Sequence, residues 1–188
     1  MKILVTGATG FIGQNLVKVL LDKNYEVHCI VRVDSNTSNI SQNITIFKYD
    51  QNIDGLIEYF NEQKFDGLIH LASLFLATHT KDDISNLISS NIKFGTELLE
   101  ACKVSDVKWF INTGTFWQNY ENEDYNPVNL YAATKEAFEN IAKYYIETSN
   151  LIFTTIKLND TFGANDTRNK VFNIWNKISK SGEILDMS

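Results

Sequence analysis

The fold is decided by residues 2–13, Lys2-Ile3-Leu4-Val5-Thr6 followed directly by Gly7-Ala8-Thr9-Gly10-Phe11-Ile12-Gly13. The branched apolar side chains of the first five residues predict a buried strand. Three glycines at three-residue spacing then allow a sharp turn, a close approach to a ligand and tight packing of the next helix. That helix begins at the loop, so its N-terminus offers N–H groups and a partial positive charge to an anion. The stretch predicts a pyrophosphate-binding loop made by Gly7, Thr9, Gly10, Phe11, Ile12 and Gly13.

Three glycines can equally mark a tight turn that holds no ligand, so the surrounding sequence decides between the two interpretations. A helical repeat of apolar residues and a second hydrophobic strand, residues 27–31, follow at the distances that a nucleotide-binding unit needs. We therefore favour the phosphate-binding interpretation. The run from Thr6 to Gly13 resembles the glycine loop of the extended short-chain dehydrogenase/reductase superfamily, which includes nucleotide-sugar epimerases, dehydratases and ketoreductases.

The 188 residues carry a net charge of -6, and 44% of them are hydrophobic. This is enough chain for one globular domain, and the negative charge argues against nucleic acid and anionic membranes as main partners. No apolar run is long enough to span a membrane and no signal peptide precedes the first strand, so we expect a soluble, cytoplasmic protein. Cys29 and Cys102 lack metal-ligand spacing, which favours buried thiols with no disulfide and no bound metal.

Apolar runs alternate with helical patterns along the chain, as expected for a parallel sheet covered by helices on both faces. The strands expected after the first are residues 26–32, 44–49, 67–72, 107–113 and 151–158. The helices expected after the glycine loop are residues 53–60, a long one from about 83 to 102, 128–148 and 170–180. Six strands fit a doubly wound α/β sheet in the order 3-2-1-4-5-6, the Rossmann fold, with ligand chemistry at the carboxyl ends of strands one, two, four and five.

The end of the second strand bears on the choice of cofactor. Dinucleotide folds that use NAD usually place an acid here on the ribose 2′-hydroxyl, and Val31 cannot accept that hydrogen bond. Arg32 beside it suits a 2′-phosphate, because its planar guanidinium matches phosphate geometry. We therefore favour NADP. The alternative is that Arg32 is a solvated charge and that Asp34 binds the ribose, which favours NAD.

The resemblance implies further cofactor contacts. Asp50, after the third strand, corresponds to an acid that accepts a hydrogen bond from the adenine amino group, although a turn or capping role is nearly as good an interpretation. Leu71, Ala72 and Ser73 correspond to the segment that lines the cofactor groove. Asn91 matches an asparagine that ties its helix to the active-site strand. His70, within a hydrophobic run, is better explained as a core histidine than as a catalyst.

Tyr131 and Lys135 lie four residues apart, which places both side chains on one helix face. A neighbouring ammonium favours the phenolate, so we expect Lys135 to lower the pKa of Tyr131 toward neutrality. This spacing often arises by chance and then means only a solvated helix. Here it follows a nucleotide fold and a strand ending in Asn112-Thr113-Gly114-Thr115, as in the superfamily's triad of Ser/Thr, Tyr and Lys.

The same resemblance assigns the catalytic hydroxyl to Thr113, with Thr115 as the alternative. It implies that this hydroxyl binds the substrate carbonyl, that Tyr131 transfers a proton and that the nicotinamide transfers a hydride. Lys135 would also bind the nicotinamide ribose.

Two departures from the superfamily narrow the subclass. Its dehydratases carry an Asp-Glu pair directly after the catalytic hydroxyl, where this chain has Gly114 and Thr115. The usual Tyr-Gly is replaced by Trp117 and Gln118, which resembles the reductases that make 3,6-dideoxyhexoses on CDP, such as abequose and paratose synthases. The expected enzyme is an NADP-dependent reductase of a 4-keto sugar nucleotide. An NAD-dependent 4-epimerase and a dinucleotide-binding module without turnover stay open, as does a homodimer.

The resemblance also implies a domain division. Residues 1–163 would form the NAD(P)-binding domain, and residues 164–188 would begin a substrate-binding lobe. A new strand is expected within residues 183–188. Extended members continue further, so the resemblance covers nearly all of this chain but only part of a complete enzyme.

Overall fold

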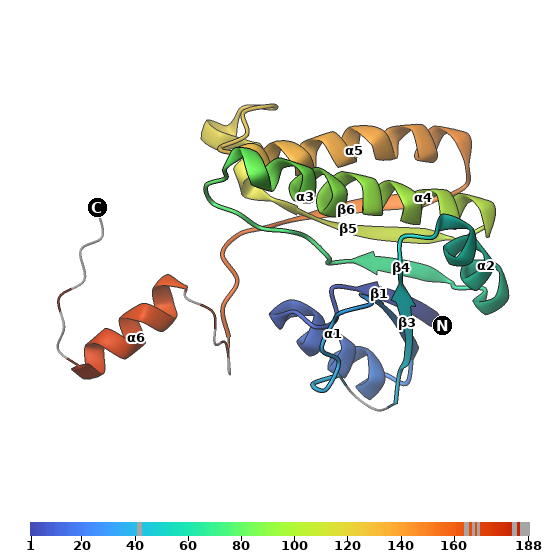
Figure 1. Cartoon of the computed structure of the whole chain (residues 1–188), viewed down its shortest axis with the longest axis horizontal. Helices are drawn as coiled ribbons and strands as arrows, with labels where there is room; N and C mark the ends of the chain where they lie inside the picture. The colour runs from blue at the N-terminus through green and yellow to red at the C-terminus, as the bar shows by residue number, and fades with distance from the viewer. Residues whose placement is uncertain (41–42, 164–165, 167, 169, 182–183, 185–188) are drawn as a thin grey trace. The chain divides into compact units, whose positions relative to one another are not determined.

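A computed structural model of the protein describes residues 1–40, 43–163, 166, 168, 170–181 and 184. The chain divides into two compact units, Met1–Leu158 and Asn159–Ser188, each described by itself. The first unit contains a six-stranded parallel sheet in the order β3-β2-β1-β4-β5-β6 (Figure 1). Its strands are β1 (Lys2–Thr6), β2 (Glu26–Arg32), β3 (Thr45–Tyr49), β4 (Gly67–His70), β5 (Trp109–Thr115) and β6 (Ile152–Leu158). The predicted fold class and strand order are confirmed.

The two faces of this sheet are covered unequally. Helix α1 (Phe11–Asp22) packs on one face, and α2 (Ile53–Gln63), α4 (Phe94–Val104) and α5 (Leu130–Thr148) pack on the other (Figure 1). The larger cluster of buried side chains lies under α2, α4 and α5 and includes Leu56, Phe60, Leu98, Phe110 and Phe138. The smaller one lies under α1 and includes Val5, Val17 and Leu20. The buried faces of these helices therefore fix the sheet from both sides.

The long helix expected over residues 83–102 is not a regular α-helix. A 3-10 turn (Lys81–Asp83) leads into α3 (Ile84–Ile88), and a π-helical segment (Ser89–Lys93) connects α3 to α4. Such a segment accommodates an extra residue and is often found at functional sites. Two further 3-10 turns, η3 (Phe116–Gln118) and η4 (Tyr120–Asn122), follow β5.

Several strand boundaries also differ from those expected, most of all those of β4 and β5. Strand β4 ends at His70 rather than at residue 72, because the Ala72 backbone N–H donates to the Thr6 hydroxyl and leaves the ladder. Strand β5 starts at Trp109 and continues to Thr115, since β6 pairs with it over its whole length. In both strands the boundary differs from the expected one by two residues, so Leu71, Ala72 and Thr113 stay close to the carboxyl edge of the sheet.

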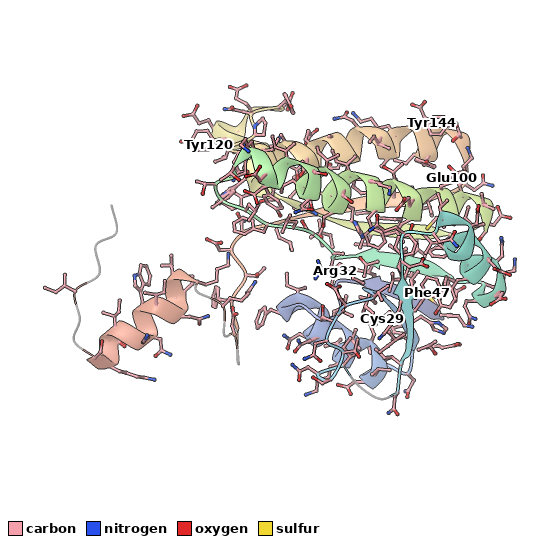
Figure 2. All side chains as sticks on the ribbon, in the orientation of Figure 1. Cys29, Arg32, Phe47, Glu100, Tyr120 and Tyr144 are labelled. Atoms are coloured by element: carbon pink, nitrogen blue, oxygen red, sulfur yellow. The ribbon has the colours of Figure 1, made fainter. Side chains whose placement is uncertain are left out.

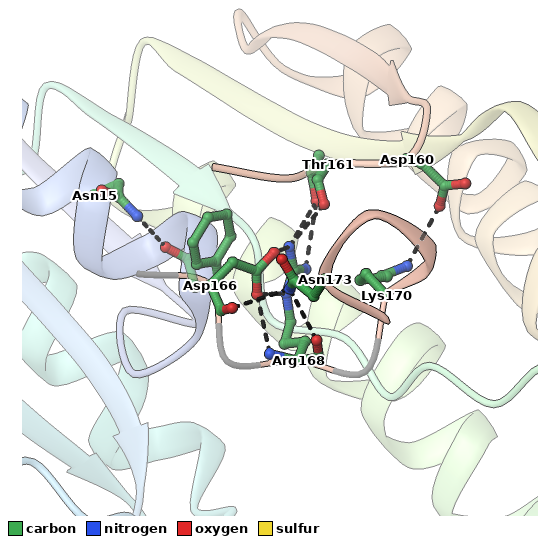
Figure 3. A network of polar contacts seen from close by, with 8 residues as sticks. Asn15, Asp160, Thr161, Asp166, Arg168, Lys170 and Asn173 are labelled. Atoms are coloured by element: carbon green, nitrogen blue, oxygen red, sulfur yellow. Dashed lines mark hydrogen bonds and ion pairs between the residues drawn. The ribbon is translucent and has the colours of Figure 1, made fainter. Parts of the chain in front are cut away.

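The second unit is built around α6 (Val171–Ser181) and the segment before it. The Arg168 guanidinium forms an ion pair with Asp166 at 2.7 Å and donates to the Thr161 carbonyl at 2.8 Å (Figure 3). Asn173 of α6 donates to the carbonyls of Asp166 and Arg168. The strand expected within residues 183–188 lies outside the described residues.

The two cysteines have the environments that the sequence predicts. Cys29 on β2 (Figure 2) and Cys102 on α4 are both free and buried, as predicted. Burial raises the pKa of the Cys29 thiol to about 12, so this thiol is inert.

In the described part of the chain, no helix has both the length and the apolar character that crossing a membrane requires.

Candidate functional site

The loop between β1 and α1 gives its three glycines different environments. Gly7 adopts a φ of 72°, and a β-carbon on it would lie 2.7 Å from the Ala72 backbone nitrogen. A β-carbon on Gly13 would overlap the Gly7 carbonyl oxygen. At Gly10 the nearest atom is that same oxygen, at 3.3 Å, and the residue is exposed. Gly7 and Gly13 therefore pack loop and helix together, and Gly10 leaves the start of α1 accessible.

The N-terminus of α1 keeps its partial positive charge. Gly10 is the N-cap, no side chain caps the helix, and its first turn contains no acidic residue. The Gln14 side chain donates to the Thr9 carbonyl at 2.8 Å and closes the loop. Thr9, Phe11 and Ile12 therefore lie where the sequence predicts them, around a helix terminus suited to a phosphate.

The segment after β4 packs against the glycine loop. The Thr6 hydroxyl lies 2.8 Å from His70 Nδ1 and accepts a hydrogen bond from the Ala72 N–H at 3.2 Å. His70 is buried, and burial together with the charge of Lys135 lowers the pKa of His70 to about 3. A neutral, bonded core histidine is what the sequence favours. Leu71, Ala72 and Ser73 follow it at the carboxyl edge of the sheet.

Asn91 lies in the π-helical segment and is almost completely buried. Its Oδ1 accepts from the Ser73 hydroxyl at 3.2 Å and from the Leu74 N–H at 2.8 Å. Its Nδ2 donates to the Leu74 carbonyl and to the Thr134 hydroxyl of α5, both at 3.0 Å. The expectation that Asn91 ties its helix to the active-site strand is therefore corrected. Its partners lie on the segment after β4 and on α5, because the side chain reaches from one helix across to the next.

The two candidate hydroxyls on β5 have different partners. The Thr113 hydroxyl donates to the His70 carbonyl at 2.9 Å, and the residue is half-buried. The Thr115 hydroxyl accepts from the Trp117 N–H at 3.3 Å and caps η3, and the residue is buried. Because capping occupies Thr115, the geometry favours Thr113 as the more accessible hydroxyl.

Tyr131 lies in the first turn of α5, half-buried, with the Phe75 ring packed edge-on at 5.0 Å between ring centroids. Burial raises the pKa of Tyr131, and a hydrogen bond with Ser73 partly opposes this. The expected lowering of the Tyr131 pKa by Lys135 is therefore wrong for this structure, because desolvation of the phenol is the largest cause of the shift and only the hydrogen bond with Ser73 opposes it. Tyr131 is protonated at neutral pH and can donate a proton.

Lys135 lies one turn further along α5 and is only 2% exposed. Burial lowers its pKa to about 8, and the charge of Glu139 opposes the shift. Within the described residues its ammonium group forms no hydrogen bond or ion pair. A buried cation without a partner is costly, so this one is suited to a ligand that supplies hydrogen-bond acceptors.

The ends of β2 and β3 carry the remaining predicted residues. Arg32 is the last residue of β2 (Figure 2) and forms an exposed ion pair with Asp34 at 3.5 Å. The Asp50 carboxylate accepts from the Asn52 N–H at 3.0 Å, which is the turn role considered as an alternative. Arg32 and Asp34 therefore share one exposed position, where a 2′-phosphate or a 2′-hydroxyl could each find a partner.

The glycine loop, Arg32, Asp50 and residues 71–73 lie at or just beyond the carboxyl ends of β1 to β4, and Thr113 lies near the end of β5. Asn91 and Tyr131 contact residues 73–75 from their helices, and the charge of Lys135 acts on His70. Together these residues offer an anion site at Gly10, a proton donor at Tyr131, a buried cation at Lys135 and a hydroxyl at Thr113. The uncapped helix and the unpartnered ammonium fit a nicotinamide dinucleotide, which brings a pyrophosphate and two riboses.

Sequence reasoning missed the partners that support these groups. Thr134 bonds to Asn91, and Phe75 packs on Tyr131. Gln118 bridges two carboxylates of α5, Glu136 and Glu139. Of these, only Glu139 could have been found from spacing, because it lies four residues after Lys135.

Comparisons with known proteins identify relatives of this chain. Residues 3–186 match the model of the NAD dependent epimerase/dehydratase family. A CDP-abequose synthase of Yersinia pseudotuberculosis is 30% identical over 191 residues, which cover 100% of this chain and 65% of that protein. A CDP-abequose synthase of Salmonella typhimurium is 29% identical over 170 residues, covering 89% of this chain and 56% of that protein. The chain thus spans less than two thirds of the length of these relatives.

Solved structures share the fold. UDP-glucose 4-epimerase of Thermotoga maritima, solved with UDP-glucose, has a TM-score of 0.86 at 23% identity and covers 98% of this chain and 65% of that one. UDP-glucuronic acid 4-epimerase of Bacillus cereus, solved with NAD, has a TM-score of 0.80 at 27% identity and covers 98% and 65% of the two chains.

Proposed function

This chain belongs to the NAD dependent epimerase/dehydratase family, and from that premise we propose that it binds NADP as part of a reductase of a 4-keto sugar nucleotide. The observation that carries the proposal is the buried, unpartnered Lys135 one helical turn from a protonated Tyr131. A dinucleotide would supply the partner that the ammonium lacks, and the phenol can donate the proton that reduction of a ketone consumes.

Each part of the cofactor has a counterpart in the chain. The pyrophosphate would bind at Gly10 and the N-terminus of α1, and the nicotinamide ribose would bind at Lys135. Leu71 and Ala72 would line the groove between these points. When bound, the reduced nicotinamide supplies the hydride that adds to the carbonyl carbon.

The side chains supply the rest of the reaction. Tyr131 donates its phenolic proton to the carbonyl oxygen, so that the ketone becomes an alcohol, and solvent then returns a proton to the phenolate. Thr113 donates a hydrogen bond to the same carbonyl oxygen in place of the His70 carbonyl. Lys135 stabilises the phenolate that Tyr131 leaves behind. Asn91 holds Ser73 and α5 at fixed separation.

Gly114 supports a reductase over a dehydratase. A β-carbon there would lie 2.6 Å from the Gln118 side-chain oxygen and 2.9 Å from the Thr155 methyl group. An acidic residue at this position, as dehydratases of the superfamily carry, would have to displace the Gln118 side chain, and in this chain acid-assisted loss of water lacks its residue. The names of the CDP-abequose synthases, together with the resemblance of Trp117 and Gln118 to the reductases that make 3,6-dideoxyhexoses on CDP, support a CDP-linked sugar.

The choice between NADP and NAD is tested at Arg32. Arg32→Asp removes the partner of the 2′-phosphate and adds a like charge, so the ratio of NADPH to NADH affinity, followed by cofactor fluorescence, should fall by about tenfold or more. Asp34→Asn, the matched control, frees Arg32 from its ion pair and should raise that ratio slightly. An unchanged ratio in Arg32→Asp, with a change in Asp34→Asn, would mean that Asp34 selects the cofactor and that it is NAD.

The reaction is tested by the loss of NADPH absorbance when CDP-4-keto sugars are added to this protein. Consumption of NADPH in proportion to the sugar supports the reductase. Interconversion of sugar epimers with no net NADPH consumption would support the 4-epimerase. This alternative stays open because a 4-epimerase of the same fold was solved with NAD. Saturable cofactor binding without either reaction would support a binding module.

A further inference from the structure

Gln118 forms an unusual buried contact behind β5. It ends η3 and is completely buried. Its side-chain oxygen accepts from the Thr115 N–H at 2.8 Å. Its amide nitrogen donates to a carboxylate oxygen of Glu136 and to one of Glu139, each at 2.7 Å. One amide group thus holds two acidic side chains of α5 together.

The backbone of β5 is shaped for this contact. A β-carbon on Gly114 would lie 2.6 Å from Gln118 Oε1 and 3.1 Å from Glu139 Oε1. The side chain of Gln118 therefore occupies the space that any larger residue at Gly114 would need. Both departures from the superfamily pattern, Gly114 and Gln118, belong to one structural arrangement.

Holding two carboxylates at one amide is costly unless a positive charge is near. Lys135 lies one helical turn before Glu139, and the charge of Glu139 acts on its ammonium group. The other titratable groups around Lys135 are Tyr131 and Glu136 on α5 and His70, which faces it from β4. His70 and Tyr131 are neutral at pH 7. Of the two carboxylates, Glu139 is the one whose charge raises the pKa of Lys135, against the larger effect of burial.

We propose that Gln118 is a positioning residue that fixes the Glu139 carboxylate beside Lys135 and so keeps Lys135 in the ammonium form that binds the cofactor ribose. The inference rests on the proposed function for its ligand, and on the contacts of Gln118 for its mechanism. Glu136 accepts a hydrogen bond from the same Gln118 amide, but its charge is not among the causes of the Lys135 pKa shift. Glu136 is therefore the matched control.

The test measures NADPH affinity by fluorescence between pH 6 and pH 10. In the unchanged chain, affinity should fall above pH about 8, as Lys135 loses its proton. Glu139→Gln keeps an oxygen that accepts from Gln118 but removes the charge, so the fall should move to lower pH by about one unit. Glu136→Gln should leave the pH of the fall in place.

Gln118→Met, which keeps the size but removes the amide, should move the fall in the same direction as Glu139→Gln, because the two carboxylates are no longer held together. A purely structural role for Gln118 would lower stability and leave the pH of the fall unchanged. Identical profiles for Glu139→Gln and the unchanged chain would overturn the proposal, even if Gln118→Met does not fold.

A second readout separates this inference from the proposed function. NMR titration of the Lys135 side chain in the cofactor-free protein reports its protonation directly. A lower titration midpoint in Glu139→Gln, with none in Glu136→Gln, supports the electrostatic arrangement even if neither NADPH nor NADH binds, in which case the proposed function fails instead. An equal midpoint in all three proteins overturns the inference while leaving cofactor binding intact.

Discussion

Charged side chains at the amino end of the parallel strands are paired within the chain, whereas, among the residues that the structure describes, the carboxyl end holds a buried charge without such a pair. At the amino end, Lys2 pairs with Glu26 at 3.0 Å, and Asp66 accepts the Lys2 backbone N–H at 2.8 Å. Buried His28 lies 2.6 Å from the Tyr59 hydroxyl. At the carboxyl end, the buried ammonium of Lys135 has no such contact in the described part of the chain.

This difference distinguishes the paired groups, which stabilise the fold, from Lys135, which is suited to binding a ligand. Paired groups at the amino end hold β1, β2 and the start of β4 together and contribute to the folded state. Lys135 at the carboxyl end lowers the stability of the folded state until a ligand supplies its partner. A charge that is buried but unpaired therefore locates a binding site more reliably than a charge that is merely buried.

The largest effect of a single substitution is expected at Tyr131, one helical turn before Lys135. Tyr131→Phe removes the proton donor of the proposed reduction and should lower its rate by about 10² to 10⁴, equivalent to roughly 3 to 5 kcal/mol, with the fold and cofactor affinity retained. Tyr144→Phe, on an exposed part of the same helix (Figure 2), should leave the rate unchanged. Normal turnover by Tyr131→Phe would remove this residue from the mechanism.

Lys135→Met separates stability from binding in one protein. Removal of the unpartnered charge should raise the free energy of unfolding at pH 7 by about 1 to 3 kcal/mol, measured in urea, and abolish measurable NADPH binding. The pKa of Lys135 is about 8 in the folded chain and near 10.5 when unfolded. The unfolded chain therefore binds one more proton between these values, and stability should rise with pH there in the unchanged protein only.

Lys143→Met, on the exposed side of the same helix, is the control and should change neither stability nor binding. A loss of stability in Lys135→Met would mean that this ammonium already has a stabilising partner, and the contrast between the two ends would not hold.

The smallest effect is expected at the amino end. Asp66→Ala removes the acceptor of the Lys2 backbone N–H and the partner of Lys108, and should lower the free energy of unfolding by about 1 kcal/mol. NADPH affinity should stay the same. Asp22→Ala, an exposed acid at the end of α1, should change neither. Loss of NADPH binding in Asp66→Ala would show that the two ends are coupled.

Much of the fold follows from local sequence. The strand before Gly7, the helix after Gly13 and the alternation of apolar runs predict the six strands in their observed order. The positions of Tyr131 and Lys135 follow from helical spacing alone. Their roles, like those of Thr113 and the cofactor-lining residues, stay predictions.

The features that the sequence did not predict depend on the burial of side chains and on contacts between residues far apart in the chain. The direction of the Tyr131 pKa shift was wrong, because the packing of Phe75 and the loss of solvent are not visible in a four-residue spacing. Gln118 meets Glu136 and Glu139 across 18 and 21 residues of chain. The partners of Asn91 lie 17, 18 and 43 residues away. No local pattern reports such pairs.

The π-helical segment has a consequence for insertions and deletions. In an α-helix each residue turns the chain by about 100°. The extra residue within Ser89–Lys93 therefore sets the rotation of α4 relative to α3. Deleting one residue here would restore regular winding but turn Leu98 and Leu99 out of the core, or Asn91 away from Thr134. Changes in chain length should thus be accepted far less readily in this segment than in the loop over residues 33–40, even though both lie between regular elements.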